Sequence, residues 1–360
     1  MLKKIASVLG ILLLIIISYV VYVMVSTGFF RDIDNQFDGK QLAKIAIPGA
    51  EDFAISYDDD FLIISSDPRR VDDSGQPRPG ALYFMDLKDD SFNPELISGN
   101  FDNPLYPHGI SMIKLDSARY QLLVVNHVPK DGNVDLNHLG KNHYIEVFEL
   151  DGKKLTHIET KDHPLIKSPN DVVAVDANTF YFTNDHFSDS SFGRFREDYM
   201  AWPNTNIVYY DGFDYRIVGD GMTYANGINL DRENNRLFVA SPRSFLLKVY
   251  DVNGDGSLSH IEDIDCNTGV DNIEFDQDGK IWIGCHPSLL VFAEYAAGRQ
   301  EKAPSEIITI DYRGKGDYDL ETIYMSDGSD MSAATVASVY GDKIFVGNVM
   351  DPGFLILERN

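Results

Sequence analysis

The chain has 360 residues and a formal net charge of −25 at pH 7, from 31 Lys and Arg against 56 Asp and Glu. This balance argues against a nucleic-acid partner, because the phosphate backbone requires Lys and Arg. The acidity permits cation binding, although it more often means a well-solvated surface. The two cysteines, Cys266 and Cys285, are too few for a disulfide scaffold and leave open whether they are bridged.

The first thirty residues predict a membrane anchor. Lys3 and Lys4 precede residues 5–25, an uncharged run rich in Ile, Leu and Val. At about 1.5 Å per residue this run matches a hydrocarbon core of about 30 Å. Its exit lacks the small-x-small pattern of a cleavage site, and the paired lysines favour a cytoplasmic N-terminus. We therefore expect a single-pass signal anchor at residues 1–30, with residues 31–360 in the periplasm, outside the cell or in a lumen.

Beyond residue 40, short β-rich runs recur between Asp, Gly and Asn turns, which is typical of an all-β protein. Six runs begin apolar and end in small or polar residues: 62–67, 122–127, 180–185, 237–242, 281–286 and 344–349. The intervals between their first residues are 60, 58, 57, 44 and 63, each close to the length of a propeller blade. We predict one six-bladed β-propeller, closed by a strand from residues 42–47. A two-domain β-sandwich is the competing fold.

Polar residues recur shortly before five of these six runs, in segments 49–52, 107–110, 169–172, 225–229 and 270–273. A propeller brings one strand end from each blade to its central tunnel, so matched positions converge there. Ca²⁺ takes six to eight oxygens from carboxylates, amides, main-chain carbonyls and water. Five oxygens for one ion would come from Glu51, Asn170, Asn226, Asp271 and Asn272. The neighbouring Asp52 and Asp171, with a main-chain carbonyl near Ile110, would hold a second ion.

These five segments, together with residues 125–127, 183–186, 284–287 and 332–340, resemble the paraoxonase/arylesterase family over nearly all of residues 40–360. The resemblance implies a six-bladed propeller with two tunnel Ca²⁺ ions, lactonase activity, and side activity on aryl esters and, in some members, organophosphates. It implies that Glu51, Asn170, Asn226, Asp271 and Asn272 bind the catalytic ion. It also implies that Asp52, Asp171 and the Ile110 carbonyl bind the structural ion. His108 and His127 match the family's histidine dyad.

The resemblance has two departures. Mammalian members close the ring with a disulfide between the chain ends, but this chain has no cysteine near either end. Ring closure must then depend on strand pairing and packing. The substrate-facing loop at residues 68–79 is charged, with Arg69, Arg70, Asp72, Asp73 and Arg78, so substrate specificity cannot be carried over from a relative.

The predicted chemistry is hydrolysis of a small lactone or ester. Ca²⁺ would stabilise the oxyanion as a Lewis acid, while His108 deprotonates water and His127 orients it. Asp271 is the alternative base, and a structural hydrogen bond is the alternative role for each histidine. We expect Asp185, His186 and His286 to line the substrate pocket, although a structural Asp185–His186 pair is an equal alternative.

Other sequence features point elsewhere. Asp251, Asn253, Asp255 and Glu262 fit an EF-hand loop, but the flanking residues favour strands, so we expect a hairpin turn and leave a third Ca²⁺ open. No Gly-x-Ser-x-Gly elbow supports Ser/His/Asp catalysis. The alternative functions are a non-catalytic, membrane-tethered calcium-binding scaffold and a sugar-lactonase-like enzyme. The natural substrate and any homo-oligomer remain open.

Overall fold

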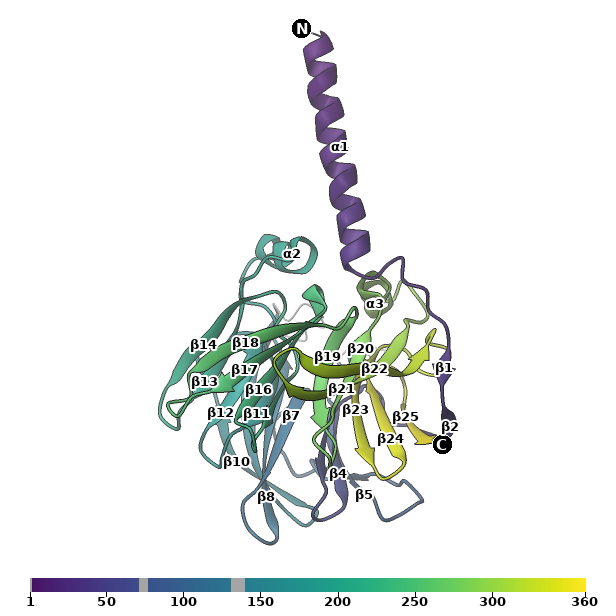
Figure 1. Ribbon diagram of the computed structural model, residues 1–360. Coiled ribbons are helices and arrows are strands. Elements are labelled where there is room, and N and C mark those ends of the chain that lie inside the picture. Colours follow the sequence, from purple (N-terminus) through teal and green to yellow (C-terminus); the bar gives the residue numbers. More distant parts are fainter. Residues whose placement is uncertain (1, 71–76, 131–139) are drawn as a thin grey trace.

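The predicted strands form sheets that radiate around a common axis, as Figure 1 shows. A computed structural model describes residues 2–70, 77–130 and 140–360. Within these residues there are six antiparallel sheets, each of four strands except for a fifth edge strand in one of them. The inner strands of neighbouring sheets contact one another in turn around the ring. The six-bladed β-propeller predicted from the repeat is therefore confirmed.

The blades follow the order of the chain. Blade 1 contains β3 (Ala50–Ser56), β4 (Phe61–Ser66), β5 (Ala81–Asp86) and β6 (Glu95–Leu96), and blade 2 contains β7 (Pro107–Lys114), β8 (Arg119–Pro129), β9 (Lys141–Asp151) and β10 (Lys154–Lys161). Blade 3 contains β11 (Pro169–Ala174), β12 (Phe180–Asn184), β13 (Thr205–Tyr210) and β14 (Tyr215–Met222), and blade 4 contains β15 (Ile228–Asp231), β16 (Arg236–Ser241), β17 (Leu246–Val252) and β18 (Leu258–Asp265). Blade 5 contains β19 (Gly269–Phe275), β20 (Ile281–His286), β21 (Ser305–Gly314), β22 (Asp317–Ser326) and the edge strand β1 (Gln36–Phe37). Blade 6 contains β23 (Ala334–Tyr340), β24 (Lys343–Asn348), β25 (Phe354–Arg359) and β2 (Gly39–Ile45).

The six apolar runs recognised in the sequence all fall on the second strand of a blade, where both faces are covered by neighbouring blades. A hydrophobic cluster fills each gap between adjacent blades; between blades 1 and 2 it joins Leu82 and Phe84 to Leu122 and Phe148. Full burial of one such side chain contributes about 1.5–3 kcal/mol. Burial on both faces explains why these strands are continuously apolar instead of alternating.

The ring closes as predicted, by strand pairing between the two ends of the propeller. β2 pairs antiparallel with β25, from Gly39 opposite Arg359 to Ile45 opposite Phe354. The outer strand of blade 6 therefore comes from the start of the propeller sequence. Preceding residues extend the closure, because β1 pairs with β22 in blade 5. These hydrogen-bonded strands join the two ends of the propeller sequence, neither of which contains a cysteine.

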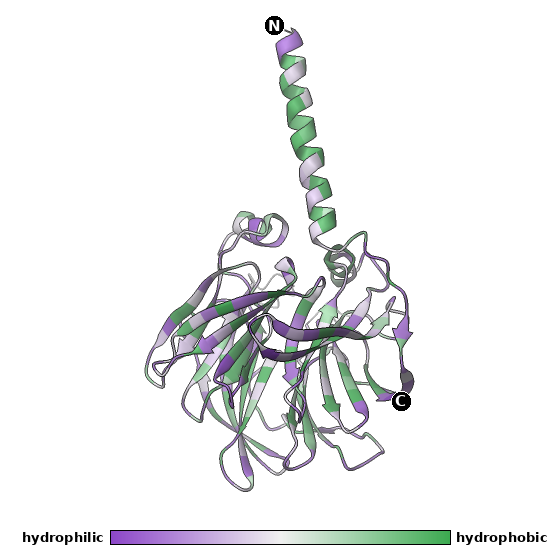
Figure 2. Cartoon of the chain, viewed as in Figure 1, coloured by the Kyte–Doolittle hydropathy of each residue, from purple (hydrophilic) through white to green (hydrophobic). Residues whose placement is uncertain are grey.

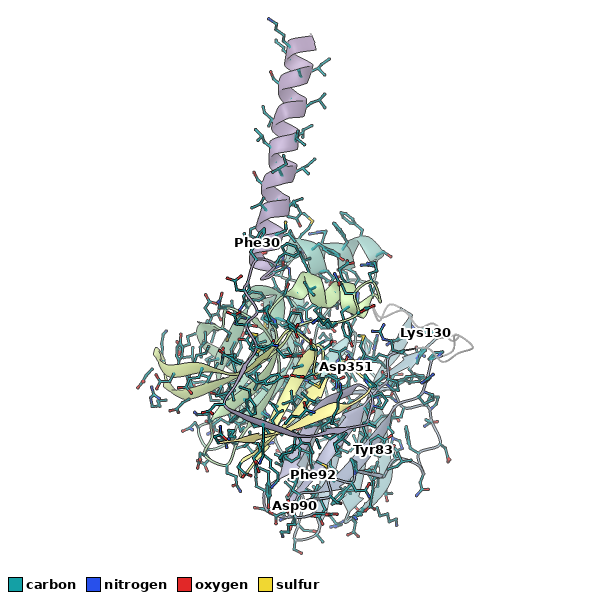
Figure 3. All side chains as sticks on the ribbon, turned by 90° about the vertical axis from the view of Figure 1, so that its right-hand side faces the viewer. Phe30, Tyr83, Asp90, Phe92, Lys130 and Asp351 are labelled. Carbon is teal, nitrogen blue, oxygen red and sulfur yellow. The ribbon has the colours of Figure 1, made fainter. Side chains whose placement is uncertain are left out.

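Three α-helices lie at one end of the propeller in the described ranges (Figure 1): α1 (Leu2–Ser26), α2 (Ser191–Met200) and α3 (Leu289–Ala296). Figure 2 shows that α1 is apolar over nearly all its length apart from a hydrophilic N-terminal turn. The stretch Lys3–Ser26 is long and apolar enough to cross a membrane, and its apolar window is not buried against the propeller. Figure 3 shows Phe30 near the base of α1, whereas Asp90 and Phe92 lie toward the far end.

Candidate active site and metal centre

The inner strands bring the predicted polar segments together around one cavity at the α1 end of the tunnel. The cavity has a volume of about 650 Å³. Its lining includes Glu51, His108, Asn170, Asn226 and Asp271, each from a different blade. Five residues that are up to 220 positions apart in the chain thus share one space, as the repeat predicted.

A local irregularity in the inner strands positions these side chains. The strand register shifts between Ala50 and Asp52, between Pro107 and Ile110, between Pro169 and Val172, and between Val270 and Ile273. Each shift falls on a predicted site residue. A β-bulge leaves one residue unpaired and re-aims neighbouring side chains, so two consecutive residues need not alternate between faces. Adjacent residues such as Asp271 and Asn272 can therefore contribute to the same site.

Five residues form what we call the cavity layer: Glu51, Asn170, Asn226, Asp271 and Asn272. Within the described ranges, four buried oxygens of this layer have no hydrogen-bond partner: Glu51 Oε2, Asn170 Oδ1, Asn226 Oδ1 and Asn272 Oδ1. Leaving one buried acceptor unsatisfied costs about 1–3 kcal/mol, and native proteins contain few of them. Four such oxygens in one place fit the donor set of Ca²⁺, which binds carboxylate and amide oxygens.

Two carboxylates remain among the predicted ligands, those of Asp52 and Asp171. Together with Ile110 they form what we call the inner layer. Asp52 accepts the main-chain N–H of Ile110 at 2.7 Å, which places Ile110 beside it. Asp171 accepts the N–H of Ile228 at 2.8 Å. Burial raises the pKa of both carboxyls well above the ordinary value, and for Asp52 the charges of Asp171 and Glu51 add to this.

The inner layer requires the blades to approach closely. A Cβ atom on Gly109 would lie 2.3 Å from Asp171 Oδ1, so a side chain there would displace the carboxylate. Among the residues described, His, Cys, Asp and Glu side chains form no group of three or more with metal-binding geometry. An ion in either layer would therefore depend on amide or main-chain oxygens as well, which is usual for Ca²⁺.

The predicted histidine dyad is in hydrogen-bond contact. His108 Nε2 lies 2.9 Å from Glu51 Oε1, and its Nδ1 lies 2.8 Å from His127 Nε2. Beyond this pair, His127 Nδ1 lies 2.8 Å from Nδ1 of His143, a residue that the sequence did not single out. Burial lowers the pKa of His127 well below its ordinary value, and the neighbouring His143 and His108 lower it further.

Glu51 also faces a cation from the loop that the sequence marked as substrate-facing. Arg69 Nη2 lies 3.7 Å from Glu51 Oε2. Burial opposes ionisation of Glu51, but His108 and Arg69 outweigh it and lower the pKa of this carboxyl. Residues 71–76 of the loop, including Asp72 and Asp73, lie outside the described residues.

The three residues expected in the substrate pocket all line the cavity. His186 bridges Asp185 at 2.8 Å and Asp198 at 2.7 Å. Burial alone would lower the pKa of His186, but these two carboxylates outweigh it and raise it to about 9. His286 Nε2 lies 2.9 Å from Asp271 Oδ2, so the fifth member of the cavity layer has a partner.

Three hydroxyl groups that the sequence did not single out fix the main chain of the site. Ser65 donates to the His108 carbonyl, Thr183 to the Asn226 carbonyl and Thr335 to the Glu51 carbonyl, each at 2.6 Å. Each bond joins one blade to the next. A small hydroxyl residue on an otherwise apolar first or second strand of a blade is the sequence signal that would have found them.

The remaining sequence predictions concern the cysteines and the EF-hand-like segment. Cys266 and Cys285 are both free and buried, and burial raises the pKa of each thiol. The EF-hand-like segment joins β17 to β18, which confirms the expected hairpin. Glu262, at the twelfth position of the pattern, accepts hydrogen bonds from Tyr312 Oη and the Gly316 N–H.

The fold and site define a six-bladed propeller whose tunnel, in the described part of the chain, presents oxygens without hydrogen-bond partners beside a histidine pair. The sequence model of the arylesterase family matches residues 73–354. The chain is 30% identical to human serum paraoxonase/arylesterase 1 and 32% identical to human serum paraoxonase/arylesterase 2. These alignments cover 75% and 76% of this chain and 75% of each relative. The chain therefore belongs to the arylesterase family.

A solved structure supports the fold independently of sequence. A luciferin-regenerating enzyme superposes with a TM-score of 0.54 at 11% identity, covering 89% of this chain and 93% of that one. At this level of identity the likeness concerns the propeller architecture.

Proposed function

We propose that this protein is a calcium-dependent hydrolase of lactones and aryl esters. The single observation that carries the proposal is the cavity layer, in which four buried oxygens have no hydrogen-bond partner among the described residues and lie beside the His108–His127 pair. A purely structural tunnel has no need of unsatisfied oxygens next to a titratable imidazole. Membership of the arylesterase family and the names of the two human paraoxonases support the same class of substrate.

The cavity layer is the proposed site of the catalytic calcium ion, and Asp52, Asp171 and the Ile110 carbonyl are the proposed ligands of a structural one. Glu51 and Asp271 supply two negative charges to the cavity layer, which matches the charge of one divalent cation. When bound, calcium acts as a Lewis acid that polarises the ester carbonyl and offsets the charge of the oxyanion. The described side chains fit this assignment by donor type, because every one offers a hard oxygen.

His108 is the proposed general base. Its Nε2 faces the cavity beside Glu51, while its Nδ1 is held by His127. In the tautomer that carries its hydrogen on Nδ1 and donates it to His127, Nε2 no longer donates to Glu51 Oε1 and is free to take a proton from water. The water oxygen attacks the carbonyl carbon, and the leaving oxygen takes up a proton as the ester bond breaks. His127 orients the ring, and burial, which lowers its pKa well below the ordinary value, keeps it neutral. Asp271 is the competing base, but it already accepts a hydrogen bond from His286.

The cavity wall favours an apolar substrate. Leu289, Leu290 and Phe292 from the α3 region line it, and Phe292 stacks on His286 with ring centroids 4.0 Å apart. Val23 and Thr27, at the end of α1, also line it. A lactone or aryl ester would place its apolar part against these side chains and its carbonyl toward the cavity layer.

We propose that α1 anchors the protein in a membrane as a single-pass signal anchor, with the N-terminus cytoplasmic and the propeller on the other side. The exposed apolar length of α1 and the lysines at its start support this orientation. Tyr19 donates to the Tyr199 carbonyl, so α1 is tied to α2 at the mouth of the cavity. Protection of the propeller from added protease in sealed vesicles tests the orientation.

Turnover of a panel of lactones and phenyl acetate, with and without a chelator, tests the proposed function. We expect hydrolysis that chelation abolishes and added Ca²⁺ restores. The His108→Gln variant should bind Ca²⁺ normally and lose turnover by about 100-fold or more. No turnover by a folded, calcium-bound wild-type protein would contradict the enzyme and favour the scaffold. Undiminished turnover by His108→Gln would remove His108 as the base.

A further inference from the structure

Arg69 brings a positive charge to the wall of the cavity from the loop that follows β4. Its side chain lines the cavity and is 13% exposed. The guanidinium Nη2 lies 3.7 Å from Glu51 Oε2, which is an ion pair but is longer than a hydrogen bond. An arginine side chain carries five N–H donors in a planar fork, so this one long contact leaves those donors available to a ligand in the cavity.

The backbone holds Arg69 in a conformation that non-glycine residues rarely adopt. Its φ of 48° lies in the left-handed region, and its N–H donates to Asp67 Oδ1 at 3.1 Å. Such conformations cost free energy and cluster at ligand-binding sites. Arg70, the next residue, instead turns to α3, where its guanidinium lies over the ring of Tyr295 at 5.5 Å from the centroid. Two consecutive arginines therefore have different surroundings, and the first of them faces the cavity.

The charges of the lining leave the cavity positive once a cation is bound. The described lining contains four carboxylates and four Lys or Arg side chains, so these charges balance. Glu51 and Asp271 belong to the cavity layer, while Asp185 and Asp198 both contact His186. One Ca²⁺ ion in the cavity layer therefore gives the lining a net positive charge. A positive cavity favours a substrate that carries an anionic group.

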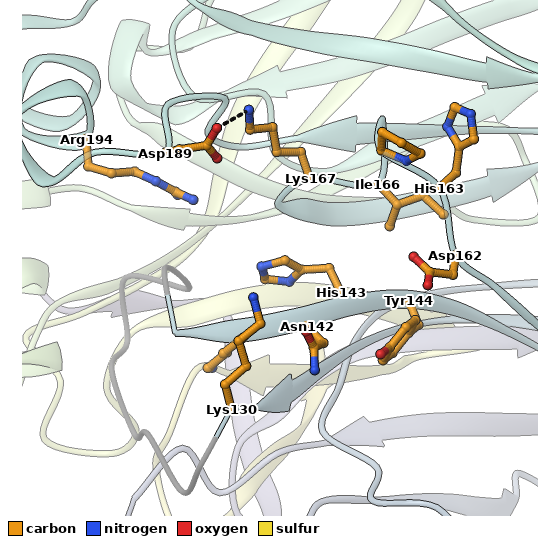
Figure 4. A pocket seen from close by; sticks show the side chains of 12 residues that line it. Lys130, Asn142, His143, Tyr144, Asp162, His163, Ile166, Lys167, Asp189 and Arg194 are labelled. Atoms are coloured by element: carbon orange, nitrogen blue, oxygen red, sulfur yellow. Dashed lines mark hydrogen bonds and ion pairs between the residues drawn. The ribbon is translucent and has the colours of Figure 1, made fainter.

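The space beside this cavity is cationic as well. Lys141 lines both the substrate cavity and a second cavity of about 660 Å³ between blades 2 and 3. Figure 4 shows Lys130 on one wall of the second cavity and Lys167, Asp189 and Arg194 on the other. The Lys, Arg, Asp and Glu side chains of its described lining are Lys130, Lys141, Asp162, Lys167, Asp189 and Arg194. Cations thus outnumber carboxylates here although the whole chain has a net charge of −25, and this local field attracts anions.

We propose that Arg69 is a specificity-determining residue that binds an acidic group of the substrate, so that the preferred lactone or aryl ester carries a carboxylate. The proposal deepens the proposed hydrolase function and rests on it. The substrate carboxylate accepts two parallel hydrogen bonds from the guanidinium, a geometry that arginine offers and lysine does not. The ester carbonyl then lies toward the cavity layer, and the apolar part of the substrate lies against Leu289 and Phe292. The acidic group itself is unchanged by the hydrolysis.

The test compares monophenyl adipate with phenyl hexanoate in the full-length protein, because these two esters differ in a terminal carboxylate. We expect the wild type to favour monophenyl adipate in kcat/KM by about 30-fold, the factor that a hydrogen bond between charged groups contributes. Arg69→Met should abolish this preference, and Arg69→Lys, which keeps the charge without the planar fork, should retain part of it. Arg70→Met is the matched control and should keep the preference of the wild type, because Arg70 contacts Tyr295.

Two sets of outcomes separate this proposal from the proposed function. A wild type without preference for monophenyl adipate, or an equal loss of turnover of both esters in Arg69→Met, would overturn the role of Arg69 and leave the hydrolase intact. Calorimetry of the calcium-loaded protein adds a readout that needs no turnover. Adipate should bind more tightly than hexanoate to the wild type and to Arg70→Met, and the two acids should bind equally to Arg69→Met.

This binding result would support the role of Arg69 even if the wild type hydrolyses neither ester, which contradicts the proposed function alone. Equal binding of adipate and hexanoate by the wild type would overturn the role of Arg69 whether or not the esters are hydrolysed.

Discussion

The cavity layer and the inner layer are built from adjacent residues, Glu51 beside Asp52 and Asn170 beside Asp171, yet they satisfy their oxygens in opposite ways. Within the described ranges, four oxygens of the cavity layer are buried without a hydrogen-bond partner, whereas the inner carboxylates accept main-chain N–H groups. The cavity layer therefore requires a bound ligand to satisfy its buried oxygens. The inner layer requires a cation to offset its negative charge, because its carboxylates are buried near one another and lack a nearby cationic partner in the described structure.

The difference teaches how one bulged strand can serve two purposes. An ion held by oxygens that have no hydrogen bond within the protein can exchange one of them for a substrate oxygen during a reaction. No hydrogen bond within the protein has to break for this exchange. A group fixed by main-chain N–H bonds cannot move without disturbing the strand that carries it. We therefore expect changes in the cavity layer to affect turnover first, and changes in the inner layer to affect stability first.

The largest expected effect is that of Glu51→Gln on turnover. The change removes one of the two charges of the cavity layer, so kcat/KM for phenyl acetate should fall by about 1,000-fold or more. The part of the calcium-dependent stability that comes from the inner-layer ion should remain, because the inner layer is intact. Glu233→Gln, on an exposed turn, is the matched control and should behave as wild type. Substantial turnover by Glu51→Gln would contradict the proposed role of the cavity layer in catalysis.

Asp171→Asn tests the inner layer by its calcium-dependent stability. A ligand at about 1,000 times its Kd stabilises by about 4 kcal/mol, which corresponds to roughly 6 °C in a domain of about 320 residues. We expect a chelator to lower the melting temperature of the wild type by this order or more and to lower that of Asp171→Asn by less, because only the cavity-layer ion is left to remove. An equal chelator effect on both proteins would show that Asp171 holds no ion.

Substitution of His186 tests whether its ion pairs with Asp185 and Asp198, beside the cavity layer, stabilise the fold. Its pKa of about 9, against an ordinary 6.5, means that the stabilisation is complete below pH 6.5 and lost as the pH rises through 9. Asp185, whose pKa is lowered, supports stability above its ordinary 3.8 and loses it on acidification. His186→Gln should therefore cost about 3 kcal/mol at pH 7 and little at roughly pH 10, measured by thermal or urea unfolding.

The control for this titration is a histidine–aspartate pair on the surface. His260 lies 2.7 Å from Asp263 and is exposed, so His260→Gln should cost less than about 1 kcal/mol. A loss in His186→Gln that is the same at both pH values would mean that packing, not charge, explains it.

The smallest expected effect concerns the hydroxyl that holds Glu51. Thr335→Val removes the donor to the Glu51 carbonyl without changing side-chain shape and should cost about 1 kcal/mol, because Asn272 also donates to that carbonyl. Ser338 on the same strand has a buried hydroxyl without a partner in the described ranges, so Ser338→Ala should cost nothing. Equal losses in both variants would remove the special role of Thr335.

The sequence predicted the repeat, the closing strand and the convergence of the polar segments because each depends on spacing and local pattern. It did not predict α2 and α3, which are too short to show a clear helical period. It also missed His143, because only the pairing of β8 with β9 places that residue against His127. The bulges escaped prediction for the same reason, since a register shift is a relation between two strands and not a property of either one.

Calcium content per chain, measured by elemental analysis of the purified protein and of its variants, tests the central claim most directly. Two layers with separate ligands predict two ions in the wild type, one in Glu51→Gln and one in Asp171→Asn. Loss of the ion in Glu51→Gln should abolish turnover while the calcium-dependent stability remains. A wild type that holds fewer than two ions, or a Glu51→Gln protein that keeps both, would contradict the account.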